Sequence, residues 1–144
     1  MTKIERSITI DAPVERVFAY LADPMANPEW LPGMVEVKEV HLAEEGVGTT
    51  HRWVYKMAGI RFEGENSTTE YLPNQRIVTE TKGGIESIWT WVFEPHEAGT
   101  KLNLTVEYGV PTGVLRKLTE PFVVRQNRRE AVLAMANIKA RMEE

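Results

Sequence analysis

The chain opens with Ile4-Glu-Arg-Ser-Ile-Thr-Ile-Asp-Ala-Pro-Val-Glu-Arg-Val-Phe-Ala-Tyr-Leu-Ala-Asp23-Pro24, and Asn27-Pro-Glu-Trp30 follows closely. Isoleucines at positions 4, 8 and 10 fall on one face of an extended chain, which predicts a strand with one buried side. Asp11 suits an N-cap and Pro13 suits a first helical turn, after which apolar residues recur at helical spacing. The stretch therefore predicts a strand that leads directly into an amphipathic helix.

Length and composition limit the classes of protein that this chain can form. Its 144 residues suffice for one domain with a proper core, and we expect a single domain over residues 1–144. The balance of 17 basic against 21 acidic residues argues against a dedicated nucleic-acid surface. Cysteine is absent, which excludes disulfides and thiol catalysis. No apolar run is long enough to span a membrane, so we expect a cytoplasmic protein without membrane insertion. We also expect a monomer or a weak dimer.

Glycine and proline turns divide the middle of the chain into strands whose pairing can be predicted. A turn at Ala58-Gly59 pairs Tyr55 with Phe62 and Trp53 with Gly64, which makes one face aromatic and the other charged. A turn at Pro73-Asn74 continues the same alternation and adds polar side chains to the inner face. The further predicted pairs are Asn66–Thr81, Thr68–Thr79 and Glu70–Ile77, then Phe93–Leu102, Trp91–Leu104 and Trp89–Val106 around the last loop.

A long helix is predicted after residue 113, because the chain then runs to its last residue without glycine. Pro121 should kink this helix or start its main part. The resulting order is strand, helix, short helix, six strands and long helix. Because a bent sheet cannot follow a helix about 10 Å wide everywhere, we expect a cavity between them. The apolar positions of the helix are Val124, Ala131, Met135, Ile138 and Met142.

These features resemble the START/Bet v 1-like (SRPBCC) superfamily, and within it the polyketide cyclase/dehydrase-like proteins. The resemblance covers the whole chain and implies an α+β helix-grip fold: a curved seven-stranded antiparallel sheet wrapped around the C-terminal helix, with two short helices between strands 1 and 2. It also implies a pocket for an apolar molecule more securely than it implies a reaction. The resemblance is carried by residues 7–18, Asp23-Pro24, Pro28-Glu29-Trp30, Gly46-Val-Gly48, Glu94-Pro95, Gly99-Thr100 and residues 133–143.

Aromatic and polar side chains on the predicted inner face are the candidate ligand-binding residues. Aromatic walls suit a flat or chain-like apolar ligand, and a few polar groups would orient it. The alternative is that these rings only fill the core. The candidates are Trp53, Tyr55, Phe62, Asn66, Thr68, Trp89, Trp91, Tyr108 and Met135.

Acid–base chemistry has three weaker candidates. Glu70 would have its charged form disfavoured beside apolar walls, although its closeness to a turn also favours a solvent-exposed position. His51 is expected near Asn66 on the inner face, where an imidazole could exchange a proton, and Tyr55 could take part in the same chemistry. The three histidines lack the spacing of a metal site, so we expect neither a metal nor another cofactor.

Three functions remain open from the sequence. The first is binding of an apolar small molecule, such as a lipid, isoprenoid, quinone or polyketide-like compound. The second is a cyclase or dehydratase reaction in the same cavity. The third is docking onto a macromolecule through Arg125, Arg128 and Arg129, whose cluster is also explained by a solvated helix face. Residues 23–34 and 110–118 are expected at the cavity entrance.

Overall fold

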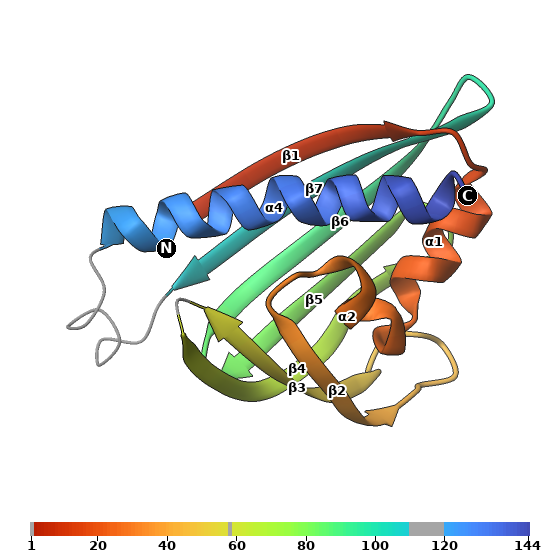
Figure 1. Cartoon of the computed structure of the whole chain (residues 1–144). Helices are drawn as coiled ribbons and strands as arrows, with labels where there is room; N and C mark the ends of the chain where they lie inside the picture. Colours follow the sequence, from red (N-terminus) through yellow and green to blue (C-terminus); the bar gives the residue numbers. More distant parts are fainter. Residues whose placement is uncertain (1, 58, 110–119) are drawn as a thin grey trace.

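The computed structural model describes residues 2–57, 59–109 and 120–144, which form a curved sheet crossed by a long helix (Figure 1). The sheet is antiparallel throughout, with the strand order β1-β7-β6-β5-β4-β3-β2. The elements are β1 (Thr2–Ile10), α1 (Val14–Ala22), the 3-10 turn η1 (Pro24–Ala26), α2 (Asn27–Trp30), β2 (Met34–His41), β3 (Thr50–Met57), β4 (Ile60–Leu72), β5 (Arg76–Gly83), β6 (Glu86–His96), β7 (Gly99–Gly109) and α4 (Glu120–Met142).

This architecture confirms the predicted fold class: α4 lies across the concave side of a seven-stranded sheet, and the short helices α1 and α2 connect β1 to β2 (Figure 1). Within the described residues, α4 packs mainly against β1 at one edge and against α2 on the other side. The helix is therefore supported at its flanks. The middle strands of the sheet do not contact the described α4 backbone closely, so side chains occupy the space between them and the helix.

The opening stretch folds as predicted except at its cap. Val17 and Phe18 are buried on the inner side of α1. The predicted Asp11 N-cap is wrong, because the helix is preceded by Pro13, which makes no side-chain cap. The Asp11 backbone N–H instead donates to the Glu143 carboxylate at 2.8 Å, which ties the corner between β1 and α1 to the C-terminal end of α4.

Most of the predicted registers are confirmed. Tyr55 pairs with Phe62 and Trp53 with Gly64, and the last hairpin has the expected partners. Ala58, the first residue of the predicted turn, lies outside the described residues.

The pairing of Glu70 with Ile77 is wrong. A β-bulge between Thr68 and Glu70 sets Glu70 opposite Val78 and brings Tyr71 opposite Ile77. One extra residue reverses which face every later side chain takes, so Tyr71 points inward where Glu70 was expected. Its ring meets that of Phe18 edge to face, with centroids 5.2 Å apart.

The apolar stripe of α4 faces the core as predicted. Met135, Ile138 and Met142 are buried and Ala131 is half-buried, whereas Val124 lies outside the described side chains. The described part of the helix runs from Glu120 to Met142, with Pro121 in its first turn. The residues before Glu120 lie outside the described part of the chain, so the start or kink expected at Pro121 stays a prediction.

A close approach at Gly64 provides a test of how tightly the inner face is packed. A Cβ atom at this position would lie 2.3 Å from the Lys82 carbonyl oxygen and 2.4 Å from the Trp53 ring. Because the backbone of a neighbouring strand cannot move aside cheaply, Gly64→Ala should lower the free energy of unfolding by about 1–3 kcal/mol. Gly109→Ala is the matched control, since a Cβ there meets nothing within 4 Å. Urea unfolding of both variants measures the difference, and equal stabilities would contradict this packing.

Candidate functional site

A cavity of about 170 Å³ lies between the middle strands, α4 and the segment from the end of α1 to the start of β2. Its wall includes the inward side chains of β3 to β7 and, from the connecting segment, Pro24, Asn27, Trp30, Leu31 and Met34. An apolar cavity of about 150 Å³ can hold benzene. The space is thus sufficient for at least one aromatic ring.

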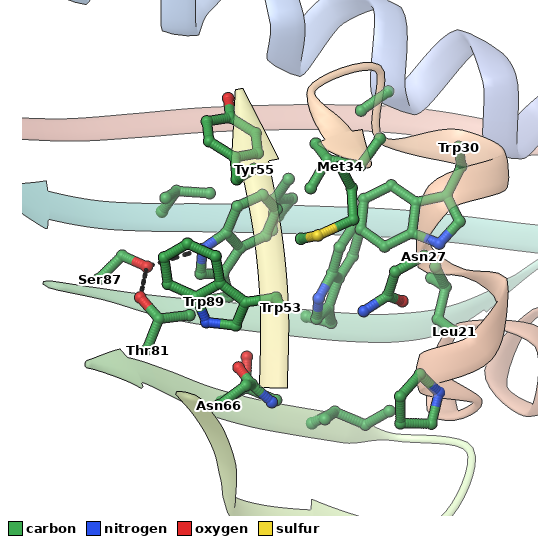
Figure 2. Close-up of a pocket in the computed structure, with 18 of the residues that line it drawn as sticks. Leu21, Asn27, Trp30, Met34, Trp53, Tyr55, Asn66, Thr81, Ser87 and Trp89 are labelled. Atoms are coloured by element: carbon green, nitrogen blue, oxygen red, sulfur yellow. Dashed lines mark hydrogen bonds between the residues drawn. The ribbon is translucent and has the colours of Figure 1, made fainter. Parts of the chain in front are cut away.

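Three tryptophans build one wall of the cavity. Trp89 and Trp91 are two residues apart on β6 and so point to the same face, with ring centroids 6.1 Å apart. Trp30, from α2, meets both rings edge to face at centroid distances of 6.3 Å and 5.5 Å. The three rings thus form a continuous aromatic part of the cavity wall, with Trp30 at the end near α2 (Figure 2).

A hydrogen-bonded chain fixes the position of Trp89. Its indole N–H donates to the Ser87 hydroxyl at 3.0 Å, and the Ser87 and Thr81 hydroxyls bond to each other (Figure 2). Thr81 in turn donates to the Ile85 carbonyl. Each hydroxyl therefore has both a donor and an acceptor role. Thr81 faces inward as predicted, and its hydroxyl helps to hold Ser87 and thereby the Trp89 ring in place.

Strand β3 contributes polar atoms to the wall that no described residue satisfies. His51 and Asn66 are cross-strand partners on β3 and β4, and both are buried, as is Trp53 nearby in the sequence. His51 Nδ1 and Trp53 Nε1 are buried without a hydrogen-bond partner among the described residues. Burial lowers the pKa of His51 to about 4, so its imidazole is neutral at pH 7. Burying a polar atom without a hydrogen-bond partner costs about 1–3 kcal/mol of folding free energy. A polar ligand atom that bonded to these nitrogens would recover part of that cost.

A second polar region surrounds Glu130 on α4. One Glu130 carboxylate oxygen accepts a hydrogen bond from the Tyr55 hydroxyl, and the other accepts one from the Gly33 backbone N–H at 3.1 Å. Burial raises the pKa of Glu130, while both donated hydrogen bonds act to lower it. Burial, together with the nearby carboxylate, also raises the pKa of Tyr55 well above its usual range, so Tyr55 remains a proton donor. Figure 2 shows Tyr55 and Asn66 on different sides of Trp53.

Further polar contacts from α4 hold the segment that carries Trp30. The Asn137 side-chain amide donates to the Trp30 carbonyl at 3.1 Å, and Arg141 forms an ion pair with Glu29 at 3.2 Å. With Glu130 bound to Gly33, three side chains on one side of α4 position α2 and the start of β2.

Most of the predicted ligand-binding residues lie in the lining of this one cavity. Phe62 and Met135 are exceptions: both are buried in the core but do not line the cavity. Met135 follows Ala134, which lines it, and one step along a helix turns a side chain by about 100°. The binding roles themselves remain predictions. The predicted residues that line the cavity are Trp53, Tyr55, Asn66, Thr68, Trp89, Trp91 and Tyr108.

The acid–base candidates separate into two groups. His51 and Tyr55 line the cavity. Glu70 does not, because the bulge turns it outward, where it forms an ion pair with Arg76 at 3.0 Å with 42% of its side chain exposed. The solvent-exposed alternative for Glu70 is therefore the one that the structure supports.

Sequence reasoning missed Glu130 as a wall residue, and it expected residues 23–34 at the cavity entrance without naming Trp30 and Met34 in the wall. For Glu130 a signal was present, since it precedes the buried Ala134 and Ile138 by four and eight residues and so shares their face of the helix. Trp30 and Met34 enter the cavity only because α2 folds back over the sheet. No spacing rule predicts that return.

The basic cluster of α4 lies on the described surface. Arg125, Arg128 and Arg129 are exposed, as both readings of the basic cluster require. Among residues 2–57, 59–109 and 120–144, no helix is long and apolar enough to cross a membrane. Residues 110–118, expected at the cavity entrance, lie outside the described part of the chain.

Solved structures with this fold come from several bacteria. A Thermus thermophilus protein, TTHA0849, matches with a TM-score of 0.83 at 23% identity, covering 98% of this chain and 97% of that one. A START superfamily protein from Mycobacterium smegmatis has a TM-score of 0.81 at 14% identity, covering 98% and 97%. The ZhuI aromatase/cyclase from Streptomyces sp. R1128 has a TM-score of 0.80 at 18% identity, covering 99% and 93%. At these identities the likeness establishes the fold.

The family follows from a match along almost the whole chain. Residues 1–143 match the model of a family described as polyketide cyclase / dehydrase and lipid transport. This agrees with the sequence resemblance and with the helix-grip fold of the START superfamily neighbour. The chain belongs to the polyketide cyclase/dehydrase and lipid transport family.

Proposed function

We propose that this protein binds a flat, largely apolar small molecule in the cavity, with an oxygen or nitrogen of the ligand placed between His51 and Trp53. The family and its structural neighbours suggest ligand binding or a polyketide cyclase-like function. One observation carries the finer proposal: a wall of three tryptophan rings shares a cavity with residues whose buried nitrogen atoms have no hydrogen-bond partner among the described residues, namely His51, Trp53 and Trp30 itself. Of the ligand classes expected from the sequence, quinones and polyketide-like compounds are flat and carry such oxygens.

The neutral His51 and the Trp53 indole offer complementary chemistry to such a ligand. The indole N–H can only donate, so it fits a carbonyl or hydroxyl oxygen. A neutral imidazole has one donor and one acceptor nitrogen, so it can serve either role. Both groups are already buried in the free protein, so their desolvation has been met during folding. Ligand binding therefore does not have to include that cost.

A catalytic function is the second candidate, and the contact between Tyr55 and Glu130 favours it. A carboxyl group with a raised pKa inside an apolar cavity suits general acid–base chemistry, and the Tyr55 hydroxyl can donate to a developing oxyanion. The aromatase/cyclase neighbours have the same fold. This candidate uses the same cavity as binding and adds a chemical step.

The first experiment is native mass spectrometry of the gently purified protein, followed by denaturation and identification of any released compound. We expect one apolar adduct of defined mass at a stoichiometry of one per chain. A clean mass without adduct, combined with no affinity for naphthalene probes, would contradict the proposal. Co-purification of a macromolecule that is lost on replacing the three exposed arginines would favour the docking alternative instead.

Replacing a cavity aromatic should weaken binding of 2-naphthylmethanol, a neutral flat probe. Trp89→Leu removes part of the aromatic wall, and we expect a dissociation constant about tenfold higher, equivalent to about 1.4 kcal/mol. Phe62→Leu is the matched control, since Phe62 is buried outside the cavity wall. Isothermal titration calorimetry measures both variants. Equal weakening in the two would show that loss of core packing, and not loss of the wall, is responsible.

The buried neutral His51 should make stability depend on pH. Its pKa is about 4 in the folded protein, against about 6.5 in an unfolded chain, so the unfolded state binds the proton more readily. Stability should therefore fall as pH drops from about 6.5 towards 4. Relative to His51→Gln, the wild type should lose about 2 kcal/mol between pH 7 and pH 4.5. Urea unfolding at several pH values measures this, and parallel profiles would show that His51 is not buried as described.

Incubation with the compound identified by mass spectrometry separates a carrier from an enzyme. If the cavity is catalytic, the compound is converted to a product that differs in mass after dehydration, or in chromatographic retention after cyclisation alone. The rate should then fall at least about 100-fold in Glu130→Gln and in Tyr55→Phe. Glu36→Gln, at an exposed residue outside the cavity wall, should keep the wild-type rate. A compound recovered unchanged from the wild type identifies a carrier.

A further inference from the structure

The charge of the cavity is set by one side chain in the described part of the chain. Glu130 lines the cavity, and no Lys, Arg or Asp does so among the described residues. His51 also lines it but is neutral at pH 7. The cavity is thus mostly apolar and contains a carboxylate without a cationic side chain in its wall.

The partners of Glu130 stabilise its charge without neutralising it. The Tyr55 hydroxyl and the Gly33 N–H each donate to a different carboxylate oxygen. Two donors and no acceptor at the two oxygens suit the ionised form, because a protonated carboxyl group would also have to donate. None of the ion pairs found among residues 2–57, 59–109 and 120–144 involves Glu130. Its negative charge therefore lacks a counter-charge from the described protein.

A bound cation would supply the missing counter-charge. Charges at low dielectric interact more strongly than in water, so a carboxylate in this wall favours a cationic ligand and opposes an anionic one. Tryptophan faces also attract cations, and four tryptophans line the same cavity. The carboxylate charge and the tryptophan faces therefore both favour a cationic ligand.

We propose that the cavity selects apolar aromatic molecules that carry a protonated amine over molecules of the same shape that are neutral or anionic, with Glu130 as the counter-charge. This inference rests on the proposed binding function and names the chemical class of its ligand. It also gives the two polar regions separate roles: Glu130 binds the ammonium group, and the His51–Trp53 region binds an oxygen or nitrogen elsewhere on the ligand.

A competing role for Glu130 is purely structural, because it holds Gly33 and so helps to place the segment with Trp30. The two roles differ in what they do to ligands of different charge. Loss of a structural contact changes the affinity for all ligands by a similar factor. Loss of the counter-charge changes the ratio between cationic and anionic ligands.

The test compares three probes that share a naphthalene ring: 2-naphthylmethylamine, 2-naphthylmethanol and 2-naphthoate, titrated calorimetrically into the full-length protein at pH 7 and low salt. We expect the amine to bind about tenfold tighter than the alcohol and the carboxylate to bind about tenfold weaker. In Glu130→Gln, the amine-to-carboxylate affinity ratio should fall from about 100 to about one. Glu36→Gln removes a charge from the exposed surface and should keep the wild-type ratio.

Each other outcome counts against a specific part of the argument. If the carboxylate probe binds wild-type protein as tightly as the amine, or the ratio persists in Glu130→Gln, the charge preference is wrong while the cavity remains a binding site. If none of the three probes binds, both the proposed binding function and this inference fail. A circular dichroism spectrum and a melting curve of Glu130→Gln show whether the variant is folded, and Glu130→Asp, which keeps the charge, should retain a preference for the amine.

Discussion

One geometric constraint governs this molecule: a straight helix cannot fill the concave side of a strongly bent sheet. In the described structure α4 rests on β1 at one flank and on α2 at the other, and the middle strands curve away from it. Large aromatic side chains reduce the remaining space without closing it. The cavity is therefore a product of the architecture, and the side chains decide what it can hold.

The polar groups of the cavity divide according to whether the protein satisfies them. The Thr81–Ser87–Trp89 chain is complete within itself, so its role is to position a ring. The nitrogens of His51 and Trp53 have no described partner, and Glu130 has hydrogen bonds but no counter-charge. The first group therefore has a structural role, and this difference is why we propose ligand recognition for the second. A list of polar wall residues alone would not separate them.

Much of the fold could be predicted from local patterns, and the failures have identifiable physical causes. Period-two alternation gave correct partners for Trp53, Trp89 and Trp91, because neither hairpin contains an irregularity between those residues and its turn. It failed at Glu70 because of a bulge, which needs no glycine or proline and leaves no mark in the sequence. Within the site, the strand residues could be predicted, whereas Trp30 depends on how α2 folds back.

The contact between the ends of the described chain has a consequence for how the protein is made. Among the described strands, β1 pairs only with β7, about a hundred residues later, and the adjoining Asp11 N–H is bonded to Glu143 beyond α4. During synthesis from the ribosome, neither partner exists until the last strand and helix have emerged, and contacts this distant in sequence form slowly. The strand that is synthesised first must therefore wait with an unpaired edge while the hairpins from β2 to β7 assemble, and it is among the last to enter the sheet.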